Sequence, residues 1–294
     1  MATKIWDTVT IIGVGLIGGS IGLALRERKL ARRVIGVGRR AASLRKATKC
    51  GAVTETTTNL AAGVADADLI IVCTPIEQVA AHILEAARHC RDDALLTDVG
   101  STKQGIVSRI EETLHVPDES KPSTGHHGTF IGSHPLAGSE KTGVQHAEAD
   151  LFVGRAVIIT PTDRSPAALV TRVERFWKSL GARVYHQSPR EHDDAVAAIS
   201  HVPHMIATAL AAATPSDLLP FVAGGWLDTT RIAAGDVELW RQILVDNRDA
   251  ILKSLEPFST TLLAFRRALE SGDEAEIVRL LQAGKKTRDA SGEG

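Results

Sequence analysis

Two short segments of the sequence are unusually rich in polar and titratable side chains: residues 97–103 (TDVGSTK) and residues 132–143 (GSHPLAGSEKTG). His134, in the second segment, precedes a proline that restricts the local backbone. An imidazole exchanges a proton near neutral pH, so His134 is a candidate general base. The pattern alone also allows a hydrogen-bonded structural histidine at this position.

A glycine motif near the N-terminus is typical of dinucleotide binding. Gly13, Gly15 and Gly18 follow a predicted strand and open an amphipathic stretch. The first glycine permits a tight turn, the second lets a pyrophosphate approach the backbone, and the third lets helix and strand pack closely. We predict that these glycines, with Leu16 and Ile17 between them, bind the cofactor. The alternative is an ordinary strand-to-helix turn.

The second predicted strand indicates which dinucleotide is bound. It ends in Gly38-Arg39-Arg40, where an NAD enzyme usually carries an Asp or Glu for the ribose hydroxyls. A guanidinium suits the 2′-phosphate of NADP, so the sequence favours NADP over NAD. We assign Arg39 and Arg40 to this phosphate and Thr74 to the same cofactor site. The alternative is a solvated basic pair on a surface loop.

These residues fall into a pattern of alternating strands and helices that predicts an α/β fold with a Rossmann-type parallel sheet. Ligands bind at the carboxyl ends of such strands. The predicted strands are residues 9–12, 34–37, 69–73, 94–98, 130–133, 156–160 and 183–185.

After Pro189 the strand-like runs end and helical periodicity continues to the C-terminus. We therefore predict two domains, a cofactor-binding domain over residues 1–187 and an all-helical domain over residues 188–294. Breaks in the helical pattern are expected at Pro215, Pro220, Gly224-Gly225, Gly235 and Pro257.

The first helical run of the second domain carries several polar residues. Ser200 and His204 are four residues apart and share one helix face. Pro203 lacks an N–H, which frees a carbonyl and favours a kink. A zinc site at His201 and His204 has no third ligand at an evident spacing, so no metal is predicted.

Composition excludes several classes of partner. With 44% hydrophobic residues and 23% charged residues, the chain can bury a large core. A formal net charge of −1 gives no reason to expect binding to nucleic acid or to an acidic membrane. The apolar runs are shorter than a membrane span requires, and the N-terminus lacks the pattern of a signal peptide. Three cysteines without C-x-x-C spacing indicate a reducing compartment, so a cytoplasmic location is expected.

Five sequence motifs, taken in order, resemble those of a known enzyme family. GVGLIGGS, DVGSTK, GSHPLAGSEKTG, SHVPH and DTTRIA together resemble the prephenate/arogenate (cyclohexadienyl) dehydrogenases, from residue 8 to about residue 285. The resemblance implies a Rossmann domain followed by a helical domain that forms a homodimer, with the active site between them. It implies oxidative decarboxylation of prephenate or arogenate, with hydride transfer to NADP, in tyrosine biosynthesis.

The resemblance also implies roles for individual residues. His134 matches the family's catalytic base, and Ser101 matches a residue that hydrogen-bonds near the C4 hydroxyl and the nicotinamide. Arg231 matches the arginine that binds a substrate carboxylate, although a helix-surface ion pair is its alternative. Substrate-lining positions are matched by His204, Ser200, Glu140 and Trp240; for Glu140 and Trp240 a surface and a core role are the alternatives.

Two residues bear on the choice between prephenate and arogenate. His204 favours prephenate, because arogenate-preferring relatives tend to have an apolar residue there. Leu227 stands where relatives commonly have a basic residue, which removes a possible second cation from the pocket. Two alternative functions also remain: another NADP-dependent hydroxyacid dehydrogenase or imine reductase, and a non-catalytic cofactor-binding regulator.

Overall fold

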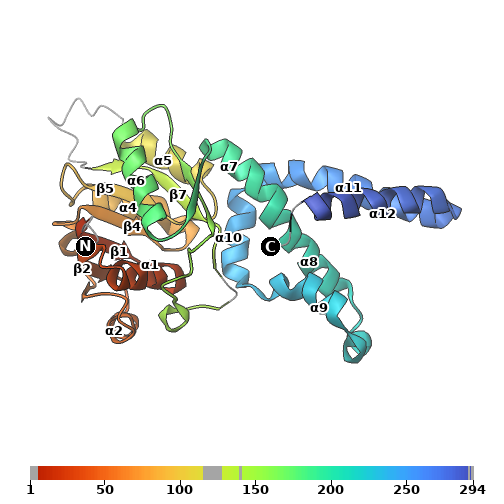
Figure 1. Cartoon of the computed structure of the whole chain (residues 1–294), viewed down its shortest axis with the longest axis horizontal. Helices are drawn as coiled ribbons and strands as arrows, with labels where there is room; N and C mark the ends of the chain where they lie inside the picture. Colours follow the sequence, from red (N-terminus) through yellow and green to blue (C-terminus); the bar gives the residue numbers. More distant parts are fainter. Residues whose placement is uncertain (1–5, 115–127, 139–140, 291, 293–294) are drawn as a thin grey trace.

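The chain folds into an α/β part followed by helices only, so the predicted fold class is confirmed (Figure 1). The computed structural model describes residues 6–114, 128–138, 141–290 and 292. The strands are β1 (Trp6–Ile12), β2 (Ala31–Val37), β3 (Glu55–Thr57), β4 (Leu69–Val72), β5 (Leu95–Asp98), β6 (Thr129–Phe130), β7 (Gly132–Pro135), β8 (Ala156–Thr160) and β9 (Arg183–His186).

The helices divide in the same way. Those of the α/β part are α1 (Leu16–Glu27), α2 (Ala41–Lys49), α3 (Leu60–Val64), α4 (Ile76–Ala87), α5 (Gln104–Leu114), the short η1 (Val144–His146) and α6 (Ala167–Ser179). Those that follow are α7 (Pro189–Val196), η2 (Ala197–His201), α8 (Val202–Ala213), η3 (Ser216–Phe221), α9 (Gly224–Thr230), η4 (Arg231–Ala234), α10 (Val237–Asp246), α11 (Arg248–Ser271) and α12 (Glu274–Ala290).

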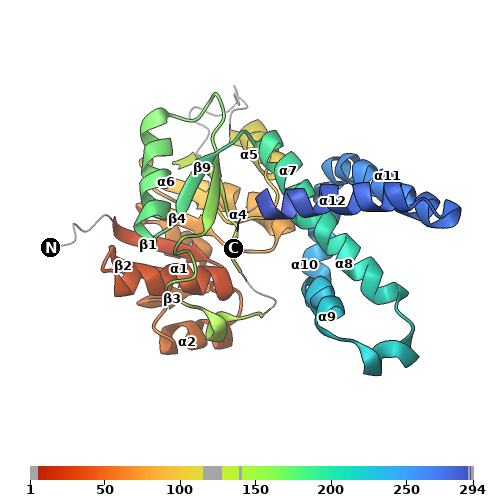
Figure 2. The ribbon, with the colours of Figure 1, turned by 45° about the vertical axis from the view of Figure 1, so that its right-hand side comes forward.

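The main sheet positions the cofactor loop. Its six strands run in the order β3-β2-β1-β4-β5-β6, and all neighbouring pairs are parallel. Helices α1 and α6 pack on one face, and α4 and α5 pack on the other, so the central strands are buried on both sides (Figures 1 and 2). The strand order reverses between β1 and β4, which opens a crevice at their carboxyl ends.

The single strand predicted at residues 130–133 is wrong, because this segment contains parts of two strands. Ile131 separates β6, the last strand of the main sheet, from β7, which starts a second sheet of order β7-β8-β9. β7 runs antiparallel to β8 and pairs His134 with Ile158, so His134 lies inside a strand and not beyond one. Pro135 is tolerated because β7 is an edge strand of its sheet.

Strand β3 was not predicted from the sequence. It has only three residues, Glu55, Thr56 and Thr57, which carry no apolar alternation. It forms the outer edge of the main sheet, where strands need no buried face.

Two features of the helical part concern its prolines. The irregularity expected near Pro203 takes the form of a π-helical turn, Ala197–His201, between α7 and α8. The break expected at Pro257 is wrong, because this residue lies inside α11. Pro257 is exposed, so water can satisfy the carbonyl that the missing N–H leaves free. The helix ends instead at Gly272, which adopts φ 67°.

The stretch Pro189–Ala213 connects the two parts of the molecule. By length and composition alone it is sufficient to span a membrane, so the expectation that every apolar run is too short is wrong. Its polar residues His192, Asp193 and His201 are buried. They bind other residues of the protein, as described below, so this stretch packs as a connecting helix.

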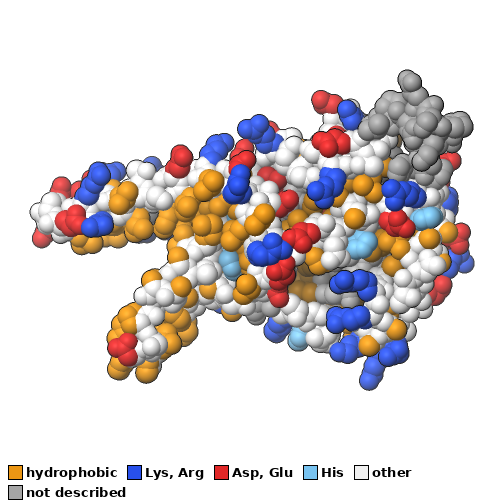
Figure 3. All heavy atoms as spheres, turned by 180° about the vertical axis from the view of Figure 1, so that it is seen from behind, with side chains coloured by type: hydrophobic (Ala, Val, Ile, Leu, Met, Phe, Trp, Pro, Cys, Tyr) orange, Lys and Arg blue, Asp and Glu red, His pale blue; other side chains and the backbone are white. Residues whose placement is uncertain are grey.

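Beyond this connection the helices extend as two arms (Figures 1 and 2). One arm contains α8, η3 and α9, and the other contains α11 and α12. Apolar side chains gather along both arms (Figure 3). The exposed large apolar residues there include Leu210, Leu218, Leu219, Phe221, Leu227, Leu252, Leu262, Leu263, Leu269, Val278 and Leu281. An apolar surface of this extent is typical of a protein interface.

Candidate active site

The glycine loop between β1 and α1 is tightly packed on one side and open on the other. Gly13 has φ +95°, and a Cβ there would lie 2.6 Å from the carbonyl oxygen of Cys73. A Cβ at Gly18 would lie 2.2 Å from the carbonyl oxygen of Gly13. At Gly15 no atom of a more distant described residue lies within 4 Å of the Cβ position. The loop therefore excludes side chains where it meets the protein and leaves space above Gly15.

Gly15 is also the N-cap of α1, and no side chain caps this helix end. Leu16 and Ile17 form its first turn and are half-buried. The amide N–H groups of a first helical turn have no partner within the helix. An anion such as a pyrophosphate fits this position.

Arg39 and Arg40 lie where β2 ends, and both are exposed. Within the described residues neither forms an ion pair, and no carboxylate occupies residues 38–40. Thr74 follows β4 and contacts the same glycine loop, because its Cγ2 would lie 3.1 Å from a Cβ at Gly13.

The hydroxyl of Thr74 lies 3.0 Å from Nδ1 of His82 on α4. The pKa of His82 is lowered by burial and then by the positive charge of Arg39. The charge of Arg39 is therefore near His82, the residue that contacts Thr74.

His134 belongs to a buried chain of polar side chains. Its Nδ1 lies 2.8 Å from Nε2 of His192, and Nδ1 of His192 lies 2.8 Å from Oδ1 of Asp193. His134 is 8% exposed and His192 is fully buried. His134 comes from β7, whereas His192 and Asp193 come from α7 of the helical part. The predicted base is therefore hydrogen-bonded across the junction of the two parts.

A buried ion pair lies beside this chain. Nζ of Lys103 lies 2.6 Å from Oδ2 of Asp98, and both side chains are fully buried. Asp98 also accepts hydrogen bonds from the backbone N–H groups of Gly100 and Ser133. These bonds offset the cost of burying two charges and fix the loop that carries the half-buried Ser101 next to β7.

The surroundings of His134 keep its imidazole neutral. Burial lowers the pKa of His134 well below its ordinary value, and the neighbouring His192, Lys103 and His201 lower it further. A neutral imidazole with a lowered pKa is available as a proton acceptor at neutral pH.

A second group of residues surrounds His204 on α8. The rings of His204 and Trp240 are stacked, with centroids 3.5 Å apart and planes at 10°. Nδ1 of His204 is buried and has no hydrogen-bond partner among the described residues. A Cβ at Gly235, the C-cap of η4, would lie 2.6 Å from Nε1 of Trp240 and 3.3 Å from Cε1 of His204. The short helix that begins with Arg231 therefore ends against this ring pair.

The two groups are linked by Asn247. Its Nδ2 donates to the backbone carbonyl of Asp193 at 2.9 Å and lies 3.1 Å from Nδ1 of His201. The His201 ring contacts Trp240 edge-on. Burial lowers the pKa of His201 to about 4. A continuous set of contacts thus joins His134 to the His204–Trp240 pair.

The remaining predicted residues are placed as follows. Arg231 is exposed, and the ion pair proposed as its structural alternative is absent among the residues that the structure describes. Ser200 is half-buried in the π turn. Glu140 lies outside the described residues. His192, Asp193 and Lys103 were not predicted as site residues, because polar side chains are usually exposed and the partners of these three are distant in the sequence.

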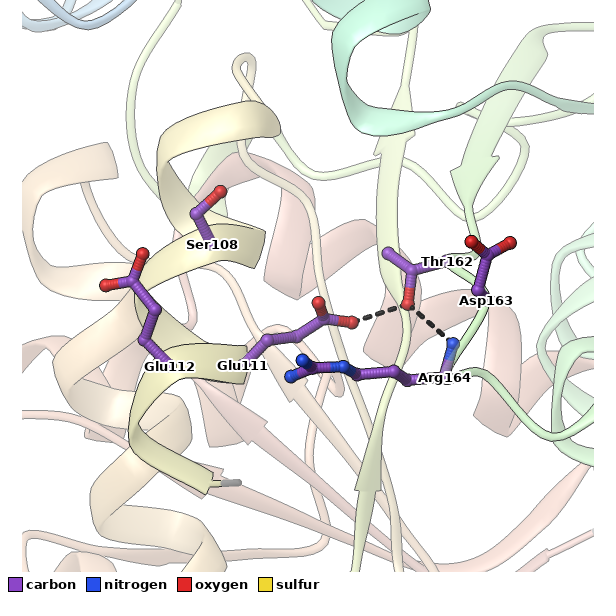
Figure 4. A pocket seen from close by; sticks show the side chains of 6 residues that line it. All are labelled: Ser108, Glu111, Glu112, Thr162, Asp163 and Arg164. Carbon is purple, nitrogen blue, oxygen red and sulfur yellow. Dashed lines mark hydrogen bonds between the residues drawn. The ribbon is translucent and has the colours of Figure 1, made fainter. Parts of the chain in front are cut away.

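The pocket formed by Ser108, Glu111, Glu112, Thr162, Asp163 and Arg164 is not this site (Figure 4). It measures about 280 Å³ and lies between α5 and the loop after β8. The Thr162 hydroxyl donates to Glu111 across it. Its lining includes no predicted site residue, and the described residues contain no group of three metal-ligating side chains.

Comparison with known proteins assigns the family. Residues 21–186 match the nucleotide-binding domain of prephenate dehydrogenase, and residues 188–283 match the dimerization domain of the same family. The chain belongs to the prephenate dehydrogenase family. The resemblance inferred from the five motifs is therefore confirmed, and prephenate dehydrogenases are oxidoreductases with a pyridine-nucleotide cofactor.

Several family members are similar over nearly the whole chain. The prephenate dehydrogenase of Bacillus subtilis is 34% identical over 290 residues, which cover 96% of this chain and 76% of that protein. The cyclohexadienyl dehydrogenase of Zymomonas mobilis is 27% identical, with coverage of 97% and 96%.

Solved structures agree. Prephenate dehydrogenase from Aquifex aeolicus, in complex with hydroxyphenyl propionate and NAD+, superposes with a TM-score of 0.86 at 29% identity and covers 97% of this chain and 98% of that chain. Synechocystis arogenate dehydrogenase gives 0.80 at 30% identity, with coverage of 97% and 99%.

The lowered pKa of His134 predicts the pH dependence of the reaction. A base acts only when unprotonated, so its activity is lost as the pH falls through its pKa. We expect kcat/KM, measured with prephenate or arogenate, to stay constant as the pH falls through the value of about 6.5 that is usual for histidine and to decline only well below that value. An acid limb with its midpoint at or above that usual value would contradict the buried, neutral state of this imidazole.

Proposed function

We propose that this protein converts prephenate to 4-hydroxyphenylpyruvate, or arogenate to tyrosine, with hydride transfer to NADP, in tyrosine biosynthesis. The observation that carries the proposal is a buried imidazole with a lowered pKa, held at the junction of a dinucleotide-binding fold and a helical part. Such a site suits an oxidation in which a base removes a hydroxyl proton as hydride leaves the same carbon.

The glycine loop fits a dinucleotide. Its open side at Gly15 and the uncapped start of α1 would hold the pyrophosphate. Thr74, beside Gly13, would line the same site. When bound, the nicotinamide supplies the hydride acceptor for C4 of the substrate.

His134 is the proposed general base. As C4 loses its hydride, the proton of the C4 hydroxyl moves to the imidazole and the C4–O bond becomes a carbonyl. The bond from the ring to its carboxylate then breaks, and its electron pair enters the ring. Carbon dioxide leaves, the ring becomes aromatic, and the C4 oxygen takes back a proton. Ser101, on the loop held by Asp98 and Lys103, would hydrogen-bond near the C4 hydroxyl.

The helical part would bind the substrate anion. Arg231 has no partner among the described residues, and its guanidinium suits bidentate binding of a carboxylate. The buried, unpartnered Nδ1 of His204 and the ring of Trp240 would contact the substrate, with Ser200 and Glu140 as further contacts. His204 favours prephenate over arogenate, and the exposed Leu227 supplies no second cation.

We propose NADP as the preferred nucleotide, with NAD as the weaker alternative. Arg39 and Arg40 are exposed without ion pairs among the described residues, at the end of the strand that carries a carboxylate in typical NAD enzymes. Their charges would pair with the 2′-phosphate.

The exposed apolar surface of the two arms supports a homodimer formed through residues 188–294, separate from a cofactor domain of residues 1–187. A cytoplasmic location remains the expectation from the sequence.

The function is tested by following NADPH formation with prephenate and with arogenate. The wild-type protein is expected to be active, and His134→Asn is expected to lower kcat by about 10²- to 10⁴-fold, because the base is lost while binding persists. His186→Asn is the matched control, since His186 is an exposed histidine on β9 of the same sheet. A wild-type protein that binds NADP but turns over neither substrate would be a regulator, and the proposal would fail.

Cofactor choice is tested with Arg39→Asp. The loss of a charged hydrogen bond to phosphate is expected to raise the KM for NADP by about 10- to 100-fold and to leave the KM for NAD unchanged or lower. Lys49→Asp, at the far end of α2, makes the same charge change as a control. An unaltered preference for NADP in Arg39→Asp would refute this assignment.

Carboxylate binding is tested with Arg231→Ala and Arg231→Lys. The alanine variant is expected to raise the KM for substrate by about 10- to 100-fold, and the lysine variant by less, because lysine keeps the charge but not the fork. Arg248→Ala removes another exposed arginine of the helical part and serves as the control. If all three variants share the wild-type KM, Arg231 does not bind the substrate.

A further inference from the structure

Asp193 accepts hydrogen bonds from three donors. Its Oδ1 accepts from the backbone N–H of Lys103 at 2.8 Å, and its Oδ2 accepts from the backbone N–H of Gln104 at 2.9 Å. These groups lie at the start of α5, where the helix dipole favours a negative charge. An ionised carboxylate only accepts hydrogen bonds, and the two N–H donors and the helix dipole both favour this ionised form.

The third contact of Asp193 therefore has a fixed polarity. Nδ1 of His192 lies 2.8 Å from Oδ1 of this carboxylate, so Nδ1 must be the donor. A neutral imidazole carries one proton only, which leaves Nε2 of His192 as an acceptor. Burial, as the largest cause, lowers the pKa of His192 despite the opposing effect of Asp193, which favours the neutral ring.

The tautomer of His134 follows from that of His192. Its Nδ1 lies 2.8 Å from the acceptor Nε2 of His192, so Nδ1 of His134 must carry a proton. The unprotonated nitrogen of His134 is then Nε2, which is the nitrogen free to take a proton from a substrate. The charged and titratable groups that act on these two rings are Lys103, Asp98, Asp193 and His201.

We infer that Asp193 and His192 are positioning residues that fix the catalytic tautomer of His134. In the opposite tautomer Nε2 would carry the proton, and His134 could not act as a base. This inference rests on the proposed role of His134 and extends it to two residues from the helical part. Asn247 holds the Asp193 backbone through its carbonyl, so the helical part sets the competence of a base that belongs to the α/β part.

The first test compares two variants of His192. Glutamine places a rotatable amide near the position of Nε2 and can accept from His134 Nδ1–H, so His192→Gln is expected to keep kcat within about tenfold of wild type. Leucine fills similar volume without an acceptor, so His192→Leu is expected to lose about 10²- to 10⁴-fold. Both variants leave the bonds from Asp193 to α5 available. If leucine supports the same kcat as glutamine, His192 has only a packing role and the inference is overturned.

The second test is a double-mutant cycle between positions 192 and 193. The relay is the hydrogen-bond chain from Asp193 through His192 to His134. Asp193→Ala removes the carboxylate at the start of this relay, and it also removes the acceptor of the N–H groups at the start of α5. The capping loss is the same in both backgrounds, whereas the tautomer effect operates only when residue 192 is histidine. We expect Asp193→Ala to lower kcat at least tenfold more in the wild-type background than in His192→Gln, which corresponds to about 1.4 kcal/mol of coupling. Equal losses in the two backgrounds would overturn the inference.

Controls separate this inference from the proposed function. NADPH binding, measured by fluorescence, and thermal unfolding show whether each variant is folded. If Asp193→Ala does not fold, the comparison of His192→Gln with His192→Leu tests the inference alone. If the wild-type protein is inactive with both substrates, the proposed function fails. If wild type is active and His134→Asn is not, while His192→Leu equals His192→Gln, only the tautomer relay fails.

Discussion

A buried carboxylate lies where the two parts of this molecule meet. Asp193 comes from the helical part, yet it accepts hydrogen bonds from the backbone N–H groups at the start of α5 in the α/β part and from Nδ1 of His192. A buried carboxylate is stable only when its oxygens are satisfied, so these three donors must stay in place together. The start of α5, the loop before it and the orientation of His134 therefore depend on how the helical part docks.

A second buried charge pair shapes the chemistry beside it. Lys103 and Asp98 are fully buried, and Asp98 has further backbone donors. Burying such a pair gives little net stability, because desolvation offsets the attraction between the charges. The pair does affect the candidate base. The ammonium group of Lys103 helps to lower the pKa of His134, while the charge of Lys103 is balanced by Asp98. The His134 imidazole is thus neutral although a lysine and an aspartate of opposite charge are buried beside it.

Features set by local sequence were predictable. The glycine loop was predicted because its demands are local: Gly13 needs a positive φ, and Gly18 leaves no room for a side chain. The motif order also gave the family and the arrangement of an α/β part before a helical part. Features that depend on tertiary contacts were missed. His134 and His192 are 58 residues apart, and Asp193 is 90 residues from the amide of Lys103 that it binds, so spacing could not reveal their hydrogen bonds. The second sheet was missed because a single residue, Ile131, separates its first strand from β6.

The protonation state of His134 can be read by NMR. In protein labelled with ¹⁵N-histidine at neutral pH, with the His134→Asn variant used to assign the resonance, long-range ¹H–¹⁵N correlations distinguish a protonated from an unprotonated ring nitrogen. The hydrogen-bond chain from Asp193 requires a proton on Nδ1 of His134 and a lone pair on Nε2. A proton found on Nε2, with Nδ1 bare, would contradict the hydrogen-bond chain from Asp193 through His192 to His134.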